Sequence, residues 1–434
     1  MESFEHMDKI RVVLPQKYDL VTGDTFQLFY RGVVEAPDPF CYDILAVCEK
    51  GKNFPRYFEF LPEEPGEHKL TIYVYGPDRT LLGQGQTLLK VAQPVSPARQ
   101  LNVLCFGASM VAGGQWASEA YRRLTAEDGQ PAGLGLENIS FIGTKEKNGA
   151  GYEGYGGWRW DSYFSTRVDD FWVICEGHDK DETDQHSLWL DEKGNLWKLE
   201  TIVPGYLKFV REGGHKSDMP SVGKLQHYAN AVHKENVEID RSFPENISPF
   251  MDPERQVIDF RSYCERHGFG AIGAVYVLLG WNGLGNVKVP WREHCQKIVA
   301  DAKQVIDLLH RDYPQAQVRI LGLPVPSVRG GTGANYGARL PYCDDYGLTR
   351  YVMDLNLAYE AWALEPEYCE FMEFINVSGQ FDTDYNMPSA DKPVNTRNKR
   401  KERVDTNGVH PAEEGYMQIA DAVFRNMVHL CGKI

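Results

Sequence analysis

Residues 101–114, LNVLCFGASMVAGG, indicate the architecture of the larger part of this 434-residue chain. The first seven form an apolar run with the length of a buried strand, and Gly107 at its end permits a tight turn. A helical pattern follows at about 116–126. A buried strand that turns directly into a helix is typical of a parallel sheet covered by helices on both faces, so we expect an α/β architecture.

The same alternation continues toward the carboxyl end. Four further apolar runs have the length of strands, and helical patterns lie between or after them. In a parallel sheet of this kind, sites gather where the strands end. The runs are ENISFIGT (137–144), IGAVYVLLG (272–280), QVRILGL (317–323) and FMEFINV (371–377), and the helices are expected at about 291–311, 347–364 and 411–430.

The amino-terminal part has a different rhythm. Residues 10–93 alternate apolar and polar positions in short runs separated by turn clusters, which predicts an all-β sandwich of roughly seven strands at most. The stretch AQPVSPARQ (92–100) carries two prolines among polar residues and is expected to be a linker. We therefore predict a β-sandwich domain over residues 1–97 and an α/β domain over residues 98–434.

A long segment at about 172–255 interrupts the alternation of strands and helices. Within it, SLWLDEKGNLWKLETIV (187–203) predicts two strands around a turn at EKGN. An insertion of this size is expected to be a functional elaboration or a lid rather than a simple loop.

Composition narrows the classes of function. A net charge of −15 without a sustained basic stripe argues against nucleic acid as a partner. No run of 18 or more apolar residues could span a bilayer, and nine cysteines without paired spacing do not indicate a disulfide framework. The start, MESFEHMDKI, lacks the features of a secretory signal. We expect a cytoplasmic protein, although a periplasmic or secreted chain whose signal had been removed would look the same, and an oligomer is compatible with the sequence.

Ser109 is the first candidate for chemistry. It follows the strand that ends at Gly107 and stands at the start of the next helix. There its hydroxyl can project above the sheet, while backbone N–H groups point toward a developing oxyanion. Ser109 thus has the position of a nucleophile, and a helix cap is the alternative.

His410 is the second candidate, within DTNGVHPAEEGYMQIAD (405–421). Pro411 suits the first position of the last helix, so His410 is expected in the loop directly before that helix. An imidazole held there can act as general base toward a serine hydroxyl. A polar surface residue is the alternative.

Four short blocks in this order resemble those of the SGNH (GDSL-like) hydrolases, a family of esterases and lipases with a flavodoxin-like three-layer α/β/α fold. The resemblance covers about residues 100–430. It implies Ser109 as nucleophile and His410 as base, with an oxyanion hole formed by the N–H groups of Ser109 and Gly157 and the side chain of Asn282. The blocks are GAS (107–109), EGYGGW (153–158), LGWNG (279–283) and NGVHP (407–411).

Three positions depart from the family's pattern, and one is Gly283, which follows Asn282 where the family often has Asp. Ala108 stands where the first block has Asp. Asn407 stands where an Asp usually accepts a hydrogen bond from the catalytic histidine and stabilises the imidazolium. Three interpretations stay open: a Ser-His dyad whose ring is oriented by a backbone carbonyl or by Asn407, which we favour, a supporting role for Asp405, or lost activity.

Aromatic side chains gather around these blocks. Tyr155 and Trp158 flank Gly157, and Trp281 precedes Asn282. Because flat rings stack on sugars, these three aromatic residues are predicted to contact a carbohydrate substrate. Packing in the core is the alternative.

Two further patterns do not indicate a cofactor. GGTGAN (330–335) lacks the Lys-Ser/Thr ending of a phosphate loop, and we expect a surface loop there. The histidines of the insertion lack metal-ligand spacing, so no metal and no cofactor are predicted.

The predicted function is that of a serine esterase acting on a small-molecule or carbohydrate ester, with O-acetyl groups on a saccharide as the favoured substrate. One alternative is a lipase-like or thioester hydrolase for longer acyl chains. An alternative of another class is a carbohydrate-binding protein with a decayed site, which Ala108 and Asn407 motivate.

Overall fold

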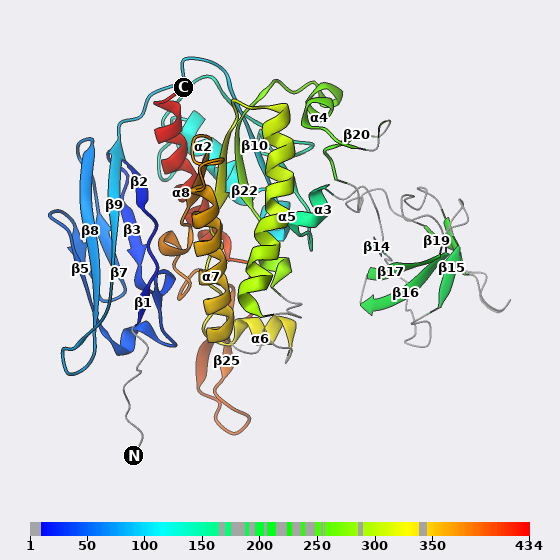
Figure 1. Cartoon of the computed structure of the whole chain (residues 1–434). Coiled ribbons are helices and arrows are strands. Elements are labelled where there is room, and N and C mark those ends of the chain that lie inside the picture. Colours follow the sequence, from blue (N-terminus) through cyan, green and yellow to red (C-terminus); the bar gives the residue numbers. More distant parts are fainter. Residues whose placement is uncertain are drawn as a thin grey trace. The chain divides into compact units, whose positions relative to one another are not determined.

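The protein is described by a computed structural model (Figure 1). It forms two compact units, Met1–Arg159, Phe269–Lys303 and Tyr313–Ile434 in the first, and Trp160–Gly268 and Gln304–Asp312 in the second. The predicted boundary at residues 97 and 98 lies inside the first unit. The structure describes residues 10–164, 170–174, 187–190, 196–203, 206–213, 224–227, 236–238, 248–252, 255, 257–284, 290–337 and 345–434.

A parallel sheet forms the centre of the first unit, as the apolar runs predict. Five of its parallel strands follow the order β11-β10-β22-β23-β24, which places β10, the first strand of this sheet along the chain, between β11 and β22. Every residue of β10 except Asn102 is buried, which explains why the strand reads as a continuous apolar run. The strands are β10 (Leu101–Gly107), β11 (Ile139–Ile142), β22 (Ile272–Leu278), β23 (Gln317–Leu321) and β24 (Met372–Ile375).

A short antiparallel pair extends this sheet beside the first strand. Strand β13 (Ala150–Gly154) pairs parallel with the end of β10, and β12 (Lys145–Lys147) pairs antiparallel with β13. The carboxyl end of β13 thus lies next to the carboxyl end of β10, where Phe106 is paired with Glu153.

Four long helices occur where the periodicity predicts them. Helix α2 packs against α8, and Trp291 at the start of α5 stacks on Tyr351 of α7 with ring centroids 4.0 Å apart. The start of α8 is at Glu413 rather than at Pro411. The extended Ala412 donates its N–H to Asn386, which delays the first helical turn. The helices are α2 (Gln115–Thr125), α5 (Trp291–Asp312), α7 (Asp345–Ala363) and α8 (Glu413–Cys431).

Residues 11–92 form two sheets that share one hydrophobic core. One sheet has the order β2-β9-β8-β5 and the other β3-β7-β6, and β1 (Arg11–Val12) pairs with β4 (Val34–Glu35). Their buried faces meet through side chains such as Leu20, Phe26 and Ile72. The strands are β2 (Lys17–Val21), β3 (Phe26–Phe29), β5 (Asp43–Val47), β6 (Lys52–Asn53), β7 (Tyr57–Phe60), β8 (Gly66–Tyr75) and β9 (Leu81–Ala92).

Ion pairs join these two sheets to the helices of the parallel sheet. Asp24 accepts hydrogen bonds from Arg123 of α2 at 2.7 Å and from Arg425 of α8 at 2.6 Å. Asn426 donates to Asp19 at 2.7 Å. The two arginines are almost fully buried, so removing Asp24 would leave their charges unpaired at considerable cost.

The second unit contains a six-stranded sheet with the order β14-β17-β16-β15-β18-β19. The predicted hairpin is confirmed, because β15 and β16 pair antiparallel with Trp189 opposite Trp197; its turn lies outside the described residues. Both tryptophans are buried. The elements are β14 (Asp170–Ile174), β15 (Leu188–Leu190), β16 (Leu196–Val203), β17 (Tyr206–Gly213), β18 (Lys224–His227), β19 (Asn236–Glu238), β20 (Met251–Asp252), β21 (Val257–Ile258), α3 (Trp160–Phe164) and α4 (Phe260–His267). Among the described residues, no helix has both the length and the apolar character needed to cross a membrane.

Candidate active site

Ser109 is the first residue of the short helix α1 (Ser109–Ala112), directly after the carboxyl end of β10. The backbones around it are in close contact. A Cβ atom added to Gly107 would lie 2.2 Å from the carbonyl oxygen of Leu278, and one added to Gly154 would lie 2.4 Å from the backbone nitrogen of Ala112. Glycine at both positions therefore lets α1 sit directly on the ends of the strands.

His410 lies in the loop before α8, and its Nε2 atom is 2.7 Å from the Oγ atom of Ser109. The structure thus brings together two residues that are 301 positions apart in the sequence. This distance is within the range needed for proton transfer from a hydroxyl to a general base. Burial lowers the pKa of His410 from its ordinary value of 6.5, so the ring is neutral, and able to accept a proton, at pH 7.

Asn407 is adjacent to the other ring nitrogen of His410. Its Oδ1 atom accepts the backbone N–H groups of Val409 and His410, both at 3.0 Å. These two bonds fix the orientation of the amide and place its Nδ2 atom 3.3 Å from Nδ1 of His410. The amide therefore presents a donor to Nδ1, whereas the carboxylate of a catalytic triad presents an acceptor.

Asp405 ends strand β26 (Lys401–Asp405) and is 3% exposed. Its carboxylate accepts a hydrogen bond from the hydroxyl of Ser327 at 2.6 Å, and Arg329 lies 4.0 Å from it. Within the described part of the chain, its hydrogen bonds do not include one to His410. The structure thus pairs Asp405 with Ser327.

Two of the three predicted oxyanion donors, Gly157 and Asn282, lie on neighbouring turns. Gly157 is exposed and has a φ of +80°, a backbone conformation that favours glycine. The side chain of Asn282 donates from Nδ2 to the carbonyl oxygen of Trp158 at 2.9 Å, which ties the two turns together and leaves a second amide hydrogen on Nδ2. Since Ser109 is the first residue of a helix, its N–H has no intrahelical acceptor.

The three predicted substrate-binding aromatics bury most of their surface. Tyr155, Trp158 and Trp281 are 7%, 6% and 5% exposed. Tyr155 stacks on Trp158 at 4.3 Å, and its hydroxyl donates to the fully buried Glu153 at 2.6 Å. These contacts brace the turn that carries Gly157, and they leave little ring surface on which a sugar could stack.

The Gly-rich segment at 330–335 is not the surface loop that its composition predicts. It forms helix α6 (Gly331–Tyr336), whose first two residues are buried. At its other end, the Oη atom of Tyr336 lies 3.5 Å from Nδ1 of His410. Sequence reasoning missed Tyr336 because it is 74 positions from His410 along the chain. Only the folded structure shows that the two side chains are close.

No group of three or more His, Cys, Asp or Glu side chains among the described residues is placed to hold a metal ion. Of the predicted site residues, Ser109 and Asn407 both contact His410, and Asn282 is hydrogen-bonded to the turn of Gly157.

No protein-family model matches this sequence, and no curated protein matches it. Among solved structures, the chain is similar to a carbohydrate esterase of family 3 from Talaromyces cellulolyticus, with 10% identity, a TM-score of 0.36 and coverage of 77% of this chain and 100% of that chain. It is also similar to a carbohydrate acetylesterase from Sinorhizobium meliloti, with 13% identity, a TM-score of 0.32 and coverage of 76% and 100%. A family 2 carbohydrate esterase with a carbohydrate binding domain, from Corynascus thermopiles, has 11% identity, a TM-score of 0.27 and coverage of 98% and 99%.

Proposed function

We propose that this chain is a serine esterase with Ser109 as nucleophile and His410 as general base. The observation that carries the proposal is the 2.7 Å contact between Oγ of Ser109 and Nε2 of His410 at the carboxyl end of β10. That edge is where sites gather in parallel α/β sheets. The lowered pKa of His410 supports a neutral base.

In the proposed reaction, Nε2 of His410 takes the hydroxyl proton as Oγ of Ser109 attacks the ester carbonyl carbon. The N–H groups of Ser109 and Gly157 and the free amide hydrogen of Asn282 stabilise the tetrahedral oxyanion. The protonated ring then gives its proton to the leaving alcohol, which leaves an acyl-serine. Water hydrolyses the acyl-serine with His410 again accepting the proton, and the acid is released.

We further propose that the first unit combines an SGNH-type, flavodoxin-like three-layer fold with an amino-terminal β-sandwich. The strand order β11-β10-β22-β23-β24 supports the first assignment, because flavodoxin-like sheets have their second strand outside the first. The core that the two sheets of residues 11–92 share supports the second.

The substrate that we propose is an O-acetyl group on a carbohydrate, since a short acyl group needs little pocket. The burial of Tyr155, Trp158 and Trp281 argues that these rings shape the site rather than stack on the sugar. The ratio of activity on p-nitrophenyl acetate to activity on the octanoate measures the preferred acyl length.

One observation favours a rival function. The donor that Asn407 presents to His410 disfavours the ring tautomer that a general base needs, as expected of a binding protein whose site has decayed. The deciding experiment is hydrolysis of p-nitrophenyl acetate by wild type, Ser109→Ala and His410→Ala, together with labelling by a fluorophosphonate.

We expect turnover and labelling by wild type and neither by Ser109→Ala. Ser140→Ala, which removes a hydroxyl from β11, is the matched control and should retain both. A correctly folded wild type that neither turns over the ester nor reacts with the probe would favour the binding protein.

A further inference from the structure

Helix α6 and the loop of residues 405–410 touch backbone to backbone. A Cβ atom added to Gly331 would lie 3.0 Å from the carbonyl oxygen of Asn407. One added to Gly408 would lie 2.2 Å from the backbone nitrogen of Thr332. Such contacts require glycine on both partners, so the Gly-rich composition of α6 is explained by its support of this loop.

The residues that precede α6 hold the same loop. The N–H of Ser327 donates to the carbonyl oxygen of Gly408 at 3.0 Å, and its hydroxyl donates to Asp405 at 2.6 Å. Ser327 therefore holds the loop before His410 at two points, Asp405 and Gly408. This fixes the position of α6 relative to His410.

The Nδ1 atom of His410 needs an acceptor during the proposed reaction. When Nε2 is free to take the proton of Ser109, the ring proton of a neutral imidazole is on Nδ1. The amide nitrogen of Asn407 at 3.3 Å cannot accept it. The phenol oxygen of Tyr336, at 3.5 Å, can, because a phenol both donates and accepts.

We propose that Tyr336 is a positioning residue for His410, whose phenol oxygen accepts the Nδ1 hydrogen and selects the tautomer with a free Nε2 lone pair. This inference rests on the proposed esterase function. It explains how the site works with Asn407 where a carboxylate is usual, and it assigns a role to α6. The phenol oxygen orients the ring but supplies no negative charge to the imidazolium.

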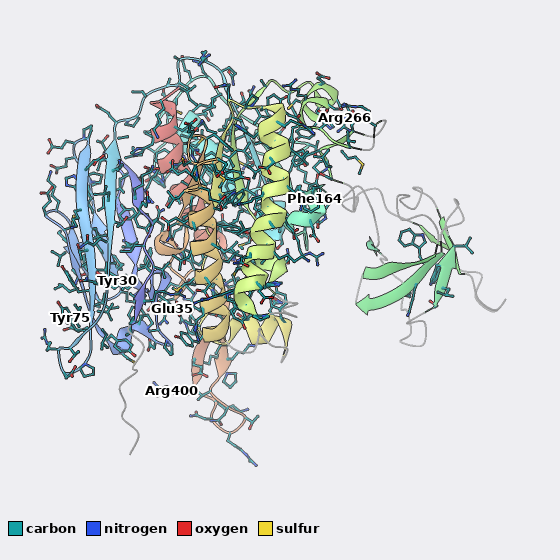
Figure 2. The ribbon with its side chains drawn as sticks, in the orientation of Figure 1. Tyr30, Glu35, Tyr75, Phe164, Arg266 and Arg400 are labelled. Atoms are coloured by element: carbon teal, nitrogen blue, oxygen red, sulfur yellow. The ribbon has the colours of Figure 1, made fainter. Side chains whose placement is uncertain are left out.

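The test is a double-mutant cycle on p-nitrophenyl acetate hydrolysis. Tyr336→Phe should lower kcat about tenfold, as expected for the loss of one partly buried hydrogen bond. In an Asn407→Asp background the same change should alter kcat less than about twofold, because the carboxylate takes over as acceptor. Tyr75→Phe removes the phenol hydroxyl of a residue at the end of β8, in the amino-terminal sheets; it is the control and should have no effect (Figure 2). Equal losses in both backgrounds would mean a merely structural role and would overturn the proposal.

A second readout does not depend on activity. Nitrogen NMR of labelled histidine should find the proton of His410 on Nδ1 in wild type and on Nε2 in Tyr336→Phe. An unchanged tautomer in Tyr336→Phe would overturn the positioning role even if the enzyme is active. Absence of ester turnover in wild type, with the tautomer shift observed, would instead overturn only the proposed function.

The hairpin of β25 (Ser389–Pro393) and β26 (Lys401–Asp405) protrudes beyond the end of α7 (Figure 1). All of residues 390–403 are exposed, and Arg400 lies in its outer part (Figure 2). This segment carries six basic and two acidic residues, whereas the whole chain has a net charge of −15. The remainder of the chain is therefore still more negative, and the hairpin is a local basic surface.

The hairpin is continuous with the candidate active site. Strand β26 ends at Asp405, which Ser327 holds, and His410 follows five residues later. A substrate long enough to extend from Ser109 past the loop of His410 could thus reach this basic surface. Exposed charges of this kind attract through long-range electrostatics that salt screens.

We infer that the hairpin recruits an anionic polysaccharide, such as one with uronate carboxylates, as the carrier of the ester. This inference also rests on the proposed function and specifies its substrate class. A saccharide with spaced carboxylates suits a small basic surface on an acidic protein better than a nucleic acid, whose dense charge the remainder of the chain repels.

The experiment compares wild type with the triple variant Arg397→Gln, Lys399→Gln and Arg400→Gln on acetylated polygalacturonate, acetylated xylan and p-nitrophenyl acetate. We expect KM for the polygalacturonate to rise about tenfold at low salt, with little change at high salt. Activity on the two neutral substrates should be unchanged. The control variant changes three exposed lysines of the amino-terminal part, Lys50, Lys52 and Lys69, to Gln, so that the same number of positive charges is lost far along the chain from the hairpin.

An equal rise in KM on xylan, or an equal effect of the control variant, would overturn the inference. A triple variant with unchanged kinetics but an altered oligomeric state would also overturn it, since the hairpin would then contact a second copy of the chain. If wild type does not hydrolyse p-nitrophenyl acetate, the esterase function is contradicted. Binding of the polysaccharide is a separate question, which titration calorimetry measures.

Discussion

Ser109 stands on the end of a buried strand, whereas His410 is carried by a loop that side-chain hydrogen bonds hold in place. On the serine side, the carbonyl of Leu278 touches Gly107, and two of the three proposed oxyanion donors are backbone N–H groups. On the histidine side, the partner groups at Nδ1 are the side chains of Asn407 and Tyr336.

This difference teaches which half of the site can change its chemistry. Backbone donors stay in place when side chains are exchanged, as long as glycine remains where backbones touch. A side-chain partner can be replaced by one residue change that keeps the shape and removes the charge, and Asn407 is such a case. The histidine side is therefore where the proposed mechanism departs from a triad.

The largest kinetic effect that separates the two sides is expected for Asn282→Ala. Loss of one oxyanion donor should lower kcat about 10²- to 10³-fold with KM little changed, because the donor acts mainly in the transition state. Steady-state kinetics on p-nitrophenyl acetate measure this. Asn102→Ala, which removes an amide from β10 that donates to Ala271, is the control, and an equal loss there would refute a specific role.

Gly107→Ala should disrupt the serine side of the site by destabilising the fold around it. The added methyl group would lie 2.2 Å from Leu278 and 2.6 Å from Val111, so the free energy of unfolding should fall by about 3 kcal/mol. Gly157→Ala meets no atom within 4 Å and should cost only about 1 kcal/mol, from its positive φ. Urea denaturation compares them, and equal losses would contradict the close contact at Gly107.

Asn407→Asp should improve the histidine side. One carboxylate oxygen can keep the bonds to the N–H groups of Val409 and His410, and the other can accept from Nδ1. We expect kcat to rise about tenfold, because a negative charge now stabilises the imidazolium. A fall in kcat with the fold intact would mean that the Asn407 amide itself is required.

The smallest expected effect is in the pH profile of wild type. Because burial lowers the pKa of His410, the ring remains a neutral base below pH 6.5. The value of kcat/KM should therefore start to fall with decreasing pH only below 6.5. Asn407→Asp should move this limb upward, since a carboxylate raises the pKa of the ring. A wild-type acid limb above pH 6.5 would contradict the desolvation of the His410 ring.

Much of the fold could be predicted because its signals are local. The five predicted parallel strands and the four long helices each have an apolar run or a helical period of their own, and only their ends shift by a few residues. Pro411 shows the limit, because the contact of Ala412 with Asn386 moves the start of α8, and no local pattern contains that contact.

The sequence alone indicated the chemical types of the site, a serine after a buried strand and a histidine before the last helix, because these positions are read from neighbouring residues. Tertiary structure alone decided what surrounds His410: that Asn407 presents its amide nitrogen, that Asp405 turns to Ser327, and that Tyr336 reaches Nδ1. The physical reason is that a hydrogen bond between distant segments depends on angles and distances of a few tenths of an ångström, which composition and periodicity do not encode.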